Sequence, residues 1–241
     1  MKSSKTIIMQ KLTKAIAAIM LSFAVVCAAG CKKHVSGNGS YNGHDYIDLG
    51  LPSGTMWATC NLGADSPEES GDYFAWGETT PKTTYNWSTY VYCKGDYNQL
   101  TKYCSQSDFG FNGFTDDLKT LLASDDAATA NWGEGWRTPT RNEWSELLIR
   151  CTPTKTTING VAGCLFTARN GNSIFLPVSE RLWDNGSRID GDMGSYWSST
   201  LNTSTPDCVK GFNFILSWDD YDIYDFGREF GLPVRAVYAT R

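Results

Sequence analysis

The sequence predicts a mixed domain of short strands, two helices and long ordered loops, preceded by an export signal. Three observations support this prediction: a well-defined helix start at Thr140, a hairpin signal at Asn170-Gly171, and an alternating strand pattern that begins at Phe212. Glycine, serine, asparagine and threonine are common in the connections between these elements. The length that remains after the export signal suits one domain.

Residues 1–30 predict a signal peptide. Four lysines precede an uncharged, mostly apolar run over residues 15–30, which is short for a membrane span. The run ends in Ala28-Ala29-Gly30-Cys31, small residues directly before a cysteine, and so resembles the lipobox of bacterial lipoproteins. The resemblance implies that Cys31 is lipidated and anchors the protein in the outer membrane. Ordinary secretion after cleavage near Ala29 is the alternative.

We predict that residues 31–43 form a lipidated, flexible tether and that residues 44–241 form the folded domain. The stretch 36–42 is rich in glycine, serine and asparagine, as flexible linkers are. Lys32 and Lys33 follow the lipobox cysteine, whereas surface-exported lipoproteins of the Bacteroides type usually carry acidic residues there. The sequence therefore leaves open whether the domain faces the periplasm or the cell surface.

The charge of the mature chain argues against a nucleic-acid partner. Removing residues 1–30 deletes four lysines and no acid, so the formal charge falls from −5 to −9. Nucleic acids bind through clustered lysine and arginine side chains, which an acidic surface of this kind does not offer.

The first half of the domain predicts two strands followed by a long irregular segment. Residues 44–49 and 55–60 predict the strands, which are joined by the turn Leu51-Pro52-Ser53-Gly54. Residues 68–118 are mostly irregular and rich in aromatic side chains. Loops of this length are uncommon, so we expect a functional or well-ordered excursion.

Two helices are predicted in the middle of the chain. The first is short, with Ser124 as its N-cap and Gly133 as its stop. The second begins at Arg141, because Thr140 and Glu143 have the spacing of a capping box. Its apolar stripe faces a core and consists of Trp144, Leu147, Leu148 and Cys151.

The second half of the domain predicts further strands. Residues 163–168 and 173–177 predict a hairpin around Asn170-Gly171. Residues 212–218 alternate apolar with other side chains, which predicts a strand with one buried face. Residues 231–237 predict the last strand.

Six cysteines follow Cys31, and an exported chain could join them in up to three disulfides. The pairs Cys93 with Cys104 and Cys151 with Cys164 are close in sequence; the alternative is buried free thiols. A zinc site is not expected, since no CxxC pair occurs. Nucleophilic catalysis would have to use His44, the one histidine near the domain.

Five stretches then carry a resemblance to a known family: residues 46–61, Phe74-Ala75-Trp76-Gly77-Glu78, residues 136–144, Tyr196-Trp197-Ser198-Ser199 and Val234-Arg235-Ala236-Val237. Together they resemble the Fibrobacter succinogenes major paralogous domain family, whose members are similar to proteins of the C-type-lectin fold. The resemblance implies a compact α+β domain of short antiparallel sheets. It further implies that the first and last strands pair and that the ligand-binding loops lie in the C-terminal half.

The chain departs from two functional branches of that fold. Formylglycine-generating enzymes depend on a C-terminal pair of cysteines, whereas Cys208 is the only cysteine after Cys164. Calcium-dependent lectins use a Trp-Asn-Asp segment, and Trp183-Asp184-Asn185 has the last two residues inverted. Calcium could still bind carboxylates, and a solvated acidic face is the alternative. The candidate ligands are Asp190, Asp192, Asp219, Asp220, Asp222 and Asp225.

We expect the ligand surface in the C-terminal third, where aromatic and acidic residues crowd a predicted hairpin tip. Aromatic faces with hydrogen-bonding carboxylates suit protein ligands and sugar rings alike. The alternative is that Trp218 and Tyr224 are core residues; Trp197 is expected in the core. The predicted ligand-binding residues are Trp218, Asp219, Asp220, Tyr221, Tyr224 and Asp225, bordered by Arg228 and Asn202.

These features together predict a non-enzymatic lipoprotein of the cell envelope that binds a glycan or protein ligand without a required cofactor. One alternative is a receptor whose loops are varied by a diversity-generating retroelement. Another is a carbohydrate-active or formylglycine-generating-like enzyme, in which Asp220 and Asp225 would do the acid-base work. A structural envelope protein is the third alternative. The sequence predicts no oligomeric state.

Overall fold

The computed structural model describes residues 38–184, 186–188 and 191–239. The chain divides into two units, Met1–Ser36 and Gly37–Arg241, and the description below concerns the second. The predicted signal peptide, Cys31, Asn185 and Asp190 lie outside the described residues. Within those ranges the fold is mixed and rich in sheet, with two α-helices and antiparallel strand pairs, as an α+β domain has. No helix among them has the length and apolar character that crossing a membrane requires.

The opening and closing strands share one five-stranded antiparallel sheet. Its order is β1 (Gly39–Tyr41), β2 (His44–Asp48), β3 (Thr55–Ala58), β15 (Val237–Ala239) and β5 (Trp136–Arg137). The pairing of β3 with β15 confirms the expectation that the ends of the domain meet. Strands β1 and β2 bracket the turn residues Asn42 and Gly43, whose φ angles are 50° and 83°.

Strand β1 lies inside the range 31–43 that its composition predicts as a tether, so the folded domain begins earlier than His44. Tertiary packing explains the difference. The Tyr41 ring stacks on Tyr238 of β15 with 4.5 Å between ring centroids. The Trp136 indole N–H donates to the Tyr41 carbonyl at 3.0 Å. A short polar segment gains order from partners that lie far along the chain, Trp136 at 95 residues from Tyr41 and Tyr238 beyond it.

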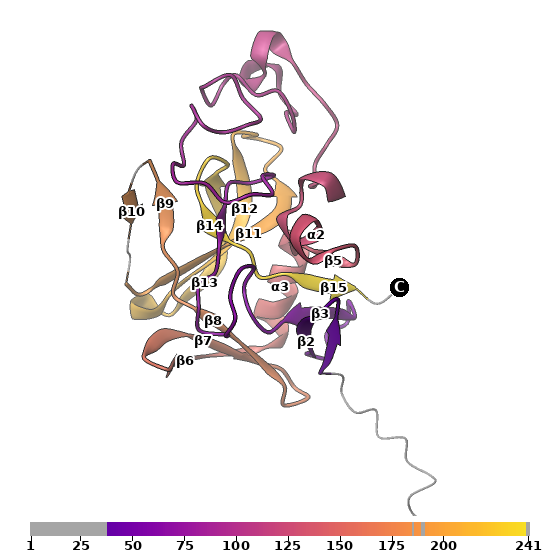
Figure 1. Ribbon diagram of the computed structural model, residues 1–241, viewed down its shortest axis with the longest axis vertical. Coiled ribbons are helices and arrows are strands. Elements are labelled where there is room, and N and C mark those ends of the chain that lie inside the picture. Colours follow the sequence, from indigo (N-terminus) through magenta and orange to yellow (C-terminus); the bar gives the residue numbers. More distant parts are fainter. Residues whose placement is uncertain (1–37, 185, 189–190, 240–241) are drawn as a thin grey trace, which may run out of the picture. The chain divides into compact units, whose positions relative to one another are not determined.

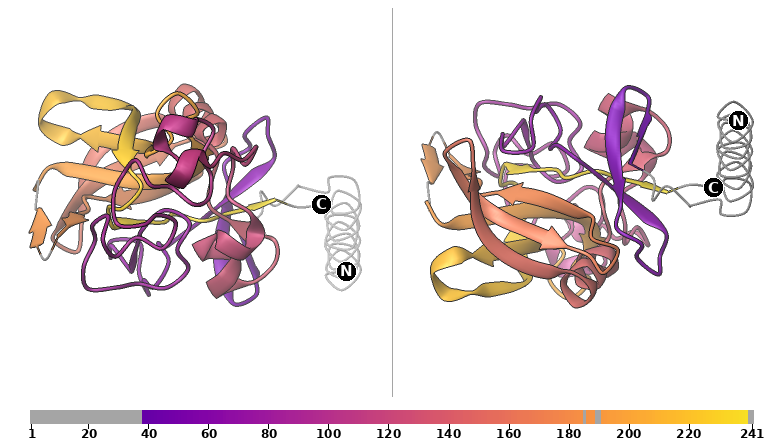
Figure 2. Two further views of the ribbon diagram at one scale, coloured as in Figure 1. Left: turned by 90° about the horizontal axis from the view of Figure 1, so that it is seen from above. Right: turned by 90° about the horizontal axis from the view of Figure 1, so that it is seen from below.

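Two three-stranded sheets form the C-terminal half (Figures 1 and 2). One contains β6 (Thr152–Ile158), β7 (Val161–Thr167) and β8 (Ser173–Pro177), and the other contains β11 (Met193–Leu201), β12 (Cys208–Ile215) and β13 (Asp220–Gly227). The predicted hairpin around Asn170-Gly171 is confirmed by the pairing of β7 with β8. Sequence analysis missed β6, which turns into β7 at Asn159 and Gly160, both with positive φ.

Two sequence predictions about strands need correction. The predicted last strand over residues 231–237 is two strands, β14 (Leu232–Pro233) and β15, separated by residues 234–236. The predicted strand over 212–218 ends at Ile215, and Leu216–Trp218 forms the 3-10 turn η4. Asn213 of that strand is buried, so both faces of the strand are covered there. Its side-chain oxygen accepts a hydrogen bond from Ser195 Oγ at 2.8 Å, which satisfies the buried amide oxygen.

The remaining strands form two short pairs. Strand β14 pairs with β4 (Tyr73–Phe74), and β9 (Arg181–Trp183) pairs with β10 (Gly186–Arg188). Between Gly77 and Leu122 the chain is irregular apart from the single-turn 3-10 helices η1 (Ser107–Phe109) and η2 (Phe111–Gly113). The prediction of a long irregular segment over 68–118 is therefore confirmed, with β4 as its one short strand.

Both predicted helices are present. Helix α2 (Ala127–Trp132) ends at Gly133 as predicted, but its N-cap is Asp126 and not Ser124. Ser124 lies in the preceding turn η3 (Ala123–Asp125), whereas Asp126 accepts from the Ala128 and Thr129 amides. Helix α3 (Arg141–Arg150) begins with the predicted capping box, and Trp144 and Leu147 on its inner stripe are fully buried.

The two larger hydrophobic clusters of the core use opposite faces of the β11–β13 sheet. The first contains Phe212 and Phe214 packed with α3, where the Trp144 ring stacks on Phe212 at 4.6 Å. The second contains Val209 and Phe226 with Trp197, which confirms the prediction for that tryptophan. Successive side chains of a strand point to opposite faces of its sheet, so each face of the β11–β13 sheet packs against a different cluster.

Trp76 and Trp144 attach a loop and helix α3, respectively, to an irregularity in β11. The register of β11 against β12 shifts between Trp197 and Leu201. The Trp76 indole N–H donates to the Ser198 carbonyl at 2.8 Å, and that of Trp144 donates to the Trp197 carbonyl at 3.1 Å. A bulge leaves strand carbonyls without a partner on the neighbouring strand. Here the N–H groups of buried indoles donate hydrogen bonds to those carbonyls.

The six cysteines of the described chain are free thiols, so the predicted pairs Cys93–Cys104 and Cys151–Cys164 are not disulfides. Cys151 and Cys164 lie in the first core cluster, and burial raises the pKa of each thiol to about 11. Their environment is that of small hydrophobic residues, which was the alternative interpretation.

Glu143 should make the stability of the domain depend on acid pH. Burial opposes its ionisation, but hydrogen bonds from Arg137 and the Thr140 amide prevail and lower its pKa from 4.5 to about 2. The stabilisation is therefore complete above pH 4.5 and lost as the pH falls toward 2. We expect Glu143→Gln to lower the free energy of unfolding by about 2–3 kcal/mol at pH 7 and to flatten this pH dependence.

Urea unfolding followed by tryptophan fluorescence between neutral and acid pH measures the effect. Glu180→Gln, at a partly exposed carboxylate, is the control and should follow the unmodified chain. Equal acid sensitivity in the Glu143→Gln variant and the unmodified chain would contradict the prediction.

Candidate functional site

The predicted ligand surface lies on the β12–β13 hairpin. Its tip is residues 216–219, where Asp219 adopts the left-handed conformation with φ 53°. Trp218 is 76% exposed, which excludes the alternative that it belongs to the core. The remaining predicted residues, 220–225, were expected at the hairpin tip but lie along strand β13. This strand is at the edge of its sheet.

One face of β13 presents acids and an aromatic ring to solvent. Asp220, Asp222 and Tyr224 alternate along the strand and therefore share a face. The Tyr224 hydroxyl donates to Asp220 Oδ2 at 2.5 Å, and this hydrogen bond raises the pKa of the phenol. Tyr224 is 40% exposed. We call Trp218, Asp220, Asp222 and Tyr224 the acidic–aromatic strand face.

Two lysines hold the acids at either end of this hairpin. Lys155 Nζ of β6 lies 2.7 Å from Asp219, and Lys210 Nζ of β12 lies 2.7 Å from Asp225. Exposed ion pairs of this kind contribute little stability, because water screens them. Among the described residues, Asp220 and Asp222 are the acids of β13 for which no such ion pair with a lysine or arginine is seen.

Three of the predicted residues do not belong to this surface. Tyr221 turns inward, where its ring packs edge-on to Phe166, and burial raises the pKa of its phenol. Asn202 lies in the β11–β12 turn, at the other end of the eight-residue strand β12 and roughly 25 Å from Trp218. Arg228 is fully buried.

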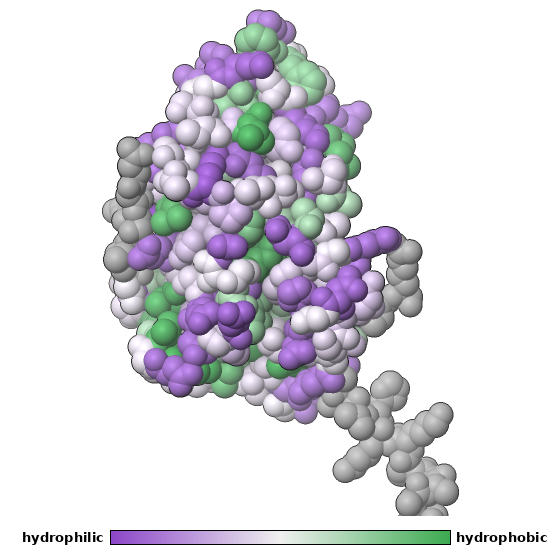
Figure 3. Space-filling model, viewed as in Figure 1, coloured by the Kyte–Doolittle hydropathy of each residue, from purple (hydrophilic) through white to green (hydrophobic). Residues whose placement is uncertain are grey.

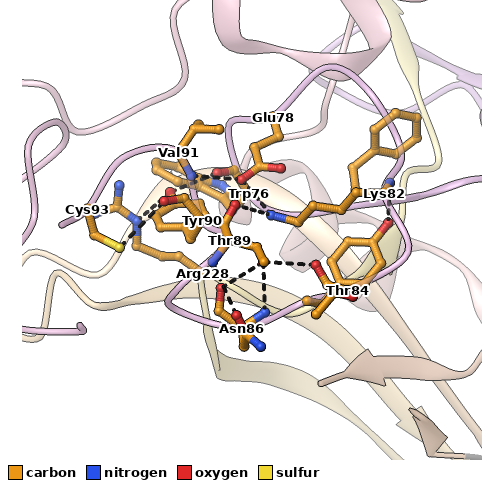
Figure 4. A network of polar contacts seen from close by, with 12 residues as sticks. Trp76, Glu78, Lys82, Thr84, Asn86, Thr89, Tyr90, Val91, Cys93 and Arg228 are labelled. Carbon is orange, nitrogen blue, oxygen red and sulfur yellow. Dashed lines mark hydrogen bonds and ion pairs between the residues drawn. The ribbon is translucent and has the colours of Figure 1, made fainter. Parts of the chain in front are cut away.

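Arg228 instead binds the irregular segment to the C-terminal sheet (Figure 4). Its Nε donates to the Tyr90 hydroxyl at 2.9 Å. Its Nη1 donates to the carbonyls of Tyr103 and Pro206, and its Nη2 donates to the carbonyl of Lys102. The guanidinium also lies 5.2 Å from the ring centre of Trp76. Sequence analysis placed Arg228 on the surface because arginine is rarely fully buried, and its acceptors lie far from it in sequence.

A second polar centre in the same view is Glu78, which sequence analysis named only as part of a family motif. Its side chain is 7% exposed. Its Oε1 accepts from Lys82 Nζ at 2.8 Å and from the Val91 amide at 3.0 Å (Figure 4). The carboxylate therefore fixes the path of the chain across residues 78–91.

His44 lines a cleft of about 360 Å³ together with Cys60 and Trp132. The imidazole stacks on the Trp132 ring at 3.9 Å, and burial lowers its pKa below the usual 6.5. The stacking of the imidazole on Trp132 therefore packs the β1–β2 hairpin against helix α2.

Residues 38–184, 186–188 and 191–239 contain no preformed calcium site. There, no group of three or more histidine, cysteine, aspartate or glutamate side chains is arranged to hold a metal ion. On the face of the domain shown in Figure 3, hydrophobic residues form small patches separated by hydrophilic ones. Recognition on that face would therefore rest on individual aromatic residues and their polar neighbours.

Comparisons with known proteins provide no relative for this chain. No protein-family model matches it. No curated protein and no solved structure matches it. The functional interpretation therefore rests on the chain's own residues.

Replacing Arg228 should loosen the irregular segment more than the rest of the domain. Arg228→Lys keeps the charge but cannot supply the Tyr90, Tyr103 and Lys102 acceptors at once, so we expect a loss of about 2–4 kcal/mol in unfolding free energy. Limited proteolysis should then cut within residues 77–118 first. Arg169→Lys, at an exposed position, is the control. Unchanged cleavage in the Arg228 variant would show that this segment is held by other contacts.

Proposed function

We propose that this chain is a lipid-anchored binding module of the cell envelope that recognises a glycan or protein ligand. The observation that carries the proposal is the exposure of Trp218 beside the outward acids and Tyr224 of β13. Most other tryptophans of the domain, such as Trp57, Trp76 and Trp144, are fully buried. A large exposed indole on a rigid hairpin is available to a ligand at little cost in conformational entropy.

Trp218 would supply the main apolar contribution of this surface to binding. Covering an exposed tryptophan removes on the order of 150 Å² from water, which is worth about 4 kcal/mol at about 25 cal/mol per Å². Asp220 and Asp222 add directional acceptors for hydroxyl or amide donors. Aromatic stacking next to carboxylates suits the apolar faces and hydroxyl edges of sugar rings, and it equally suits a protein partner with basic side chains.

We further propose that the domain has the C-type-lectin-like fold of the Fibrobacter-type major paralogous family. The family motifs and the pairing of β3 with β15 support this proposal. The lipobox-like Ala28-Ala29-Gly30-Cys31 supports outer-membrane anchoring through a lipid on Cys31, with the domain facing the periplasm or the cell surface. The acidic surface supports the absence of nucleic-acid partners.

The proposal predicts that Trp218→Ala and Tyr224→Ala each weaken ligand binding at least tenfold, since either change removes aromatic contact area. The full chain in a sugar-free detergent would be applied to arrays of host and bacterial glycans, with calcium and with a chelator. Trp183→Ala, which alters an exposed tryptophan of β9 outside the acidic–aromatic strand face, is the matched control.

The outcomes of this experiment separate the versions of the proposal. Glycan binding that survives both substitutions would reject the β12–β13 surface. Loss of binding with the chelator alone would require a bound calcium ion. If the protein binds no glycan on the arrays, glycan recognition is rejected and the protein ligand is the version of the proposal that stands.

A further inference from the structure

The outer edge of strand β13 has no neighbouring strand within the described chain. The strand pairs with β12 on one side and is the last strand of its sheet. The β12–β13 hairpin lies at the periphery of the domain in both views of Figure 2. An edge strand presents a row of backbone donors and acceptors to which an extended segment of another protein can add. With eight residues, β13 is long enough to serve as such an edge.

The register of the hairpin identifies the backbone groups that face outward. The Arg228 amide donates to the carbonyl of Asp207, the residue opposite it in the register, so this pair is of the hydrogen-bonded type. Hydrogen-bonded and non-hydrogen-bonded pairs alternate along an antiparallel ladder. The even-numbered residues of β13 therefore direct their amides and carbonyls toward β12. Tyr221, Ile223 and Asp225 direct theirs toward the open edge.

The side chains on one face of this edge favour a cationic partner. Asp220, Asp222 and Tyr224 occupy the positions at which an added strand would form non-hydrogen-bonded pairs, where opposed side chains approach most closely. Lysine or arginine opposite the two carboxylates gains charge attraction, and opposite the Tyr224 ring it gains a cation–π contact. Asp222 Oδ1 accepts from the Ile223 amide at 2.7 Å, and a cation opposite Asp222 would compete for that carboxylate and free the amide for pairing.

The other face of the edge favours apolar residues. Tyr221 and Ile223 are partly buried and pack against the first core cluster. Alternate side chains of an added strand would lie over the parts of these two residues that remain exposed. The strand that fits this edge therefore alternates basic and apolar residues. A second copy of β13 does not fit, because like charges would oppose one another.

We propose that β13 binds its partner by strand addition, and that the partner is an extended protein segment in which lysine or arginine alternates with apolar residues. This inference rests on the proposed function and narrows its ligand to a protein. Backbone hydrogen bonds would supply affinity, and the alternating cations would fix the register. Acids that only protect the edge from aggregation would bind no such segment.

The test uses a fluorescently labelled peptide of four Lys-Val repeats and the full chain in a nonionic detergent. Fluorescence anisotropy should give a Kd of about 0.1 mM at low salt, and the affinity should fall as salt is added. A peptide of four Glu-Val repeats should bind at least tenfold more weakly, because its carboxylates would oppose those of β13.

Two methylated forms of the basic peptide separate backbone pairing from charge attraction. N-methylation of the valines removes the amide donors that would face β13, so binding should weaken at least tenfold. N-methylation of the lysines removes donors that would face solvent, so the Kd should stay within about threefold. Both forms have the same charge and the same number of methyl groups, and each is the control for the other.

Charge reversal tests the acids of the edge. Asp220→Lys/Asp222→Lys should weaken binding of the basic peptide at least tenfold, because the edge then repels its lysines. The matched control is Asp108→Lys/Asp117→Lys, which changes the net charge equally at exposed acids of the irregular segment. Its Kd should stay within about threefold of that of the unmodified chain, since distant exposed charges are screened.

Amide hydrogen exchange provides a readout that does not depend on affinity alone. With the basic peptide bound, the outward amides of Tyr221, Ile223 and Asp225 should exchange at least tenfold more slowly, because they become hydrogen-bonded. The amides of Asp222 and Tyr224 already face β12 and should change little. Equal protection of both sets, or of neither, would contradict strand addition.

Strand addition is also overturned if the basic peptide does not bind, if valine methylation has no effect, or if the charge-reversed chain binds as well as the unmodified one. Glycan binding that requires Trp218, without binding of the peptide, would reject strand addition and retain the proposed surface. Peptide binding that Trp218→Ala leaves unchanged would support strand addition and reject Trp218 as the anchor of the proposed function. The two failures are therefore distinguishable.

Discussion

The buried guanidinium of Arg228 is the constraint on which the order of the domain depends. A cation removed from water must have each N–H donor satisfied, because an unsatisfied one costs several kcal/mol. Here the acceptors are the Tyr90 hydroxyl and the carbonyls of Lys102, Tyr103 and Pro206. These groups belong to the irregular segment and to the β11–β12 turn. Arg228 thus ties the irregular segment between Gly77 and Leu122 to the C-terminal sheet, because movement of that segment would leave the buried charge without its acceptors.

Arg235 is a second buried arginine, and its donors are only partly paired. The side chain is fully buried, its Nε donates to Asn61 Oδ1 at 2.8 Å, and its Nη1 donates to the Ala58 carbonyl at 3.3 Å. Its Nη2 is buried without a hydrogen-bond partner among the described residues. Burial lowers the pKa of this guanidinium. The neighbouring carbonyls of Val234 and Ala236 accept from Leu62 and Ala58. Residues 234–236 therefore hydrogen-bond to Ala58 of β3 and to Leu62 in the loop after it, and β14 and β15 do not join into one strand.

The acidic–aromatic strand face is open to solvent and suits an extended ligand. Composition alone could indicate this surface, because Trp218 and its neighbouring acids are adjacent in sequence. It could not indicate which side chains of the strand turn inward, as Tyr221 does toward Phe166.

Local signals in the sequence determined what depends on neighbours within a few residues: the capping box of Thr140 and Glu143, the turn at Asn170-Gly171, the stop at Gly133 and the length of the irregular segment. Tertiary structure decided the rest, including strand β1, the division of the last strand, the free cysteines and the burial of Arg228. The physical reason is one of range. A cap or a turn is stabilised by hydrogen bonds between residues close in sequence, whereas burial and the satisfaction of a buried charge depend on partners far along the chain.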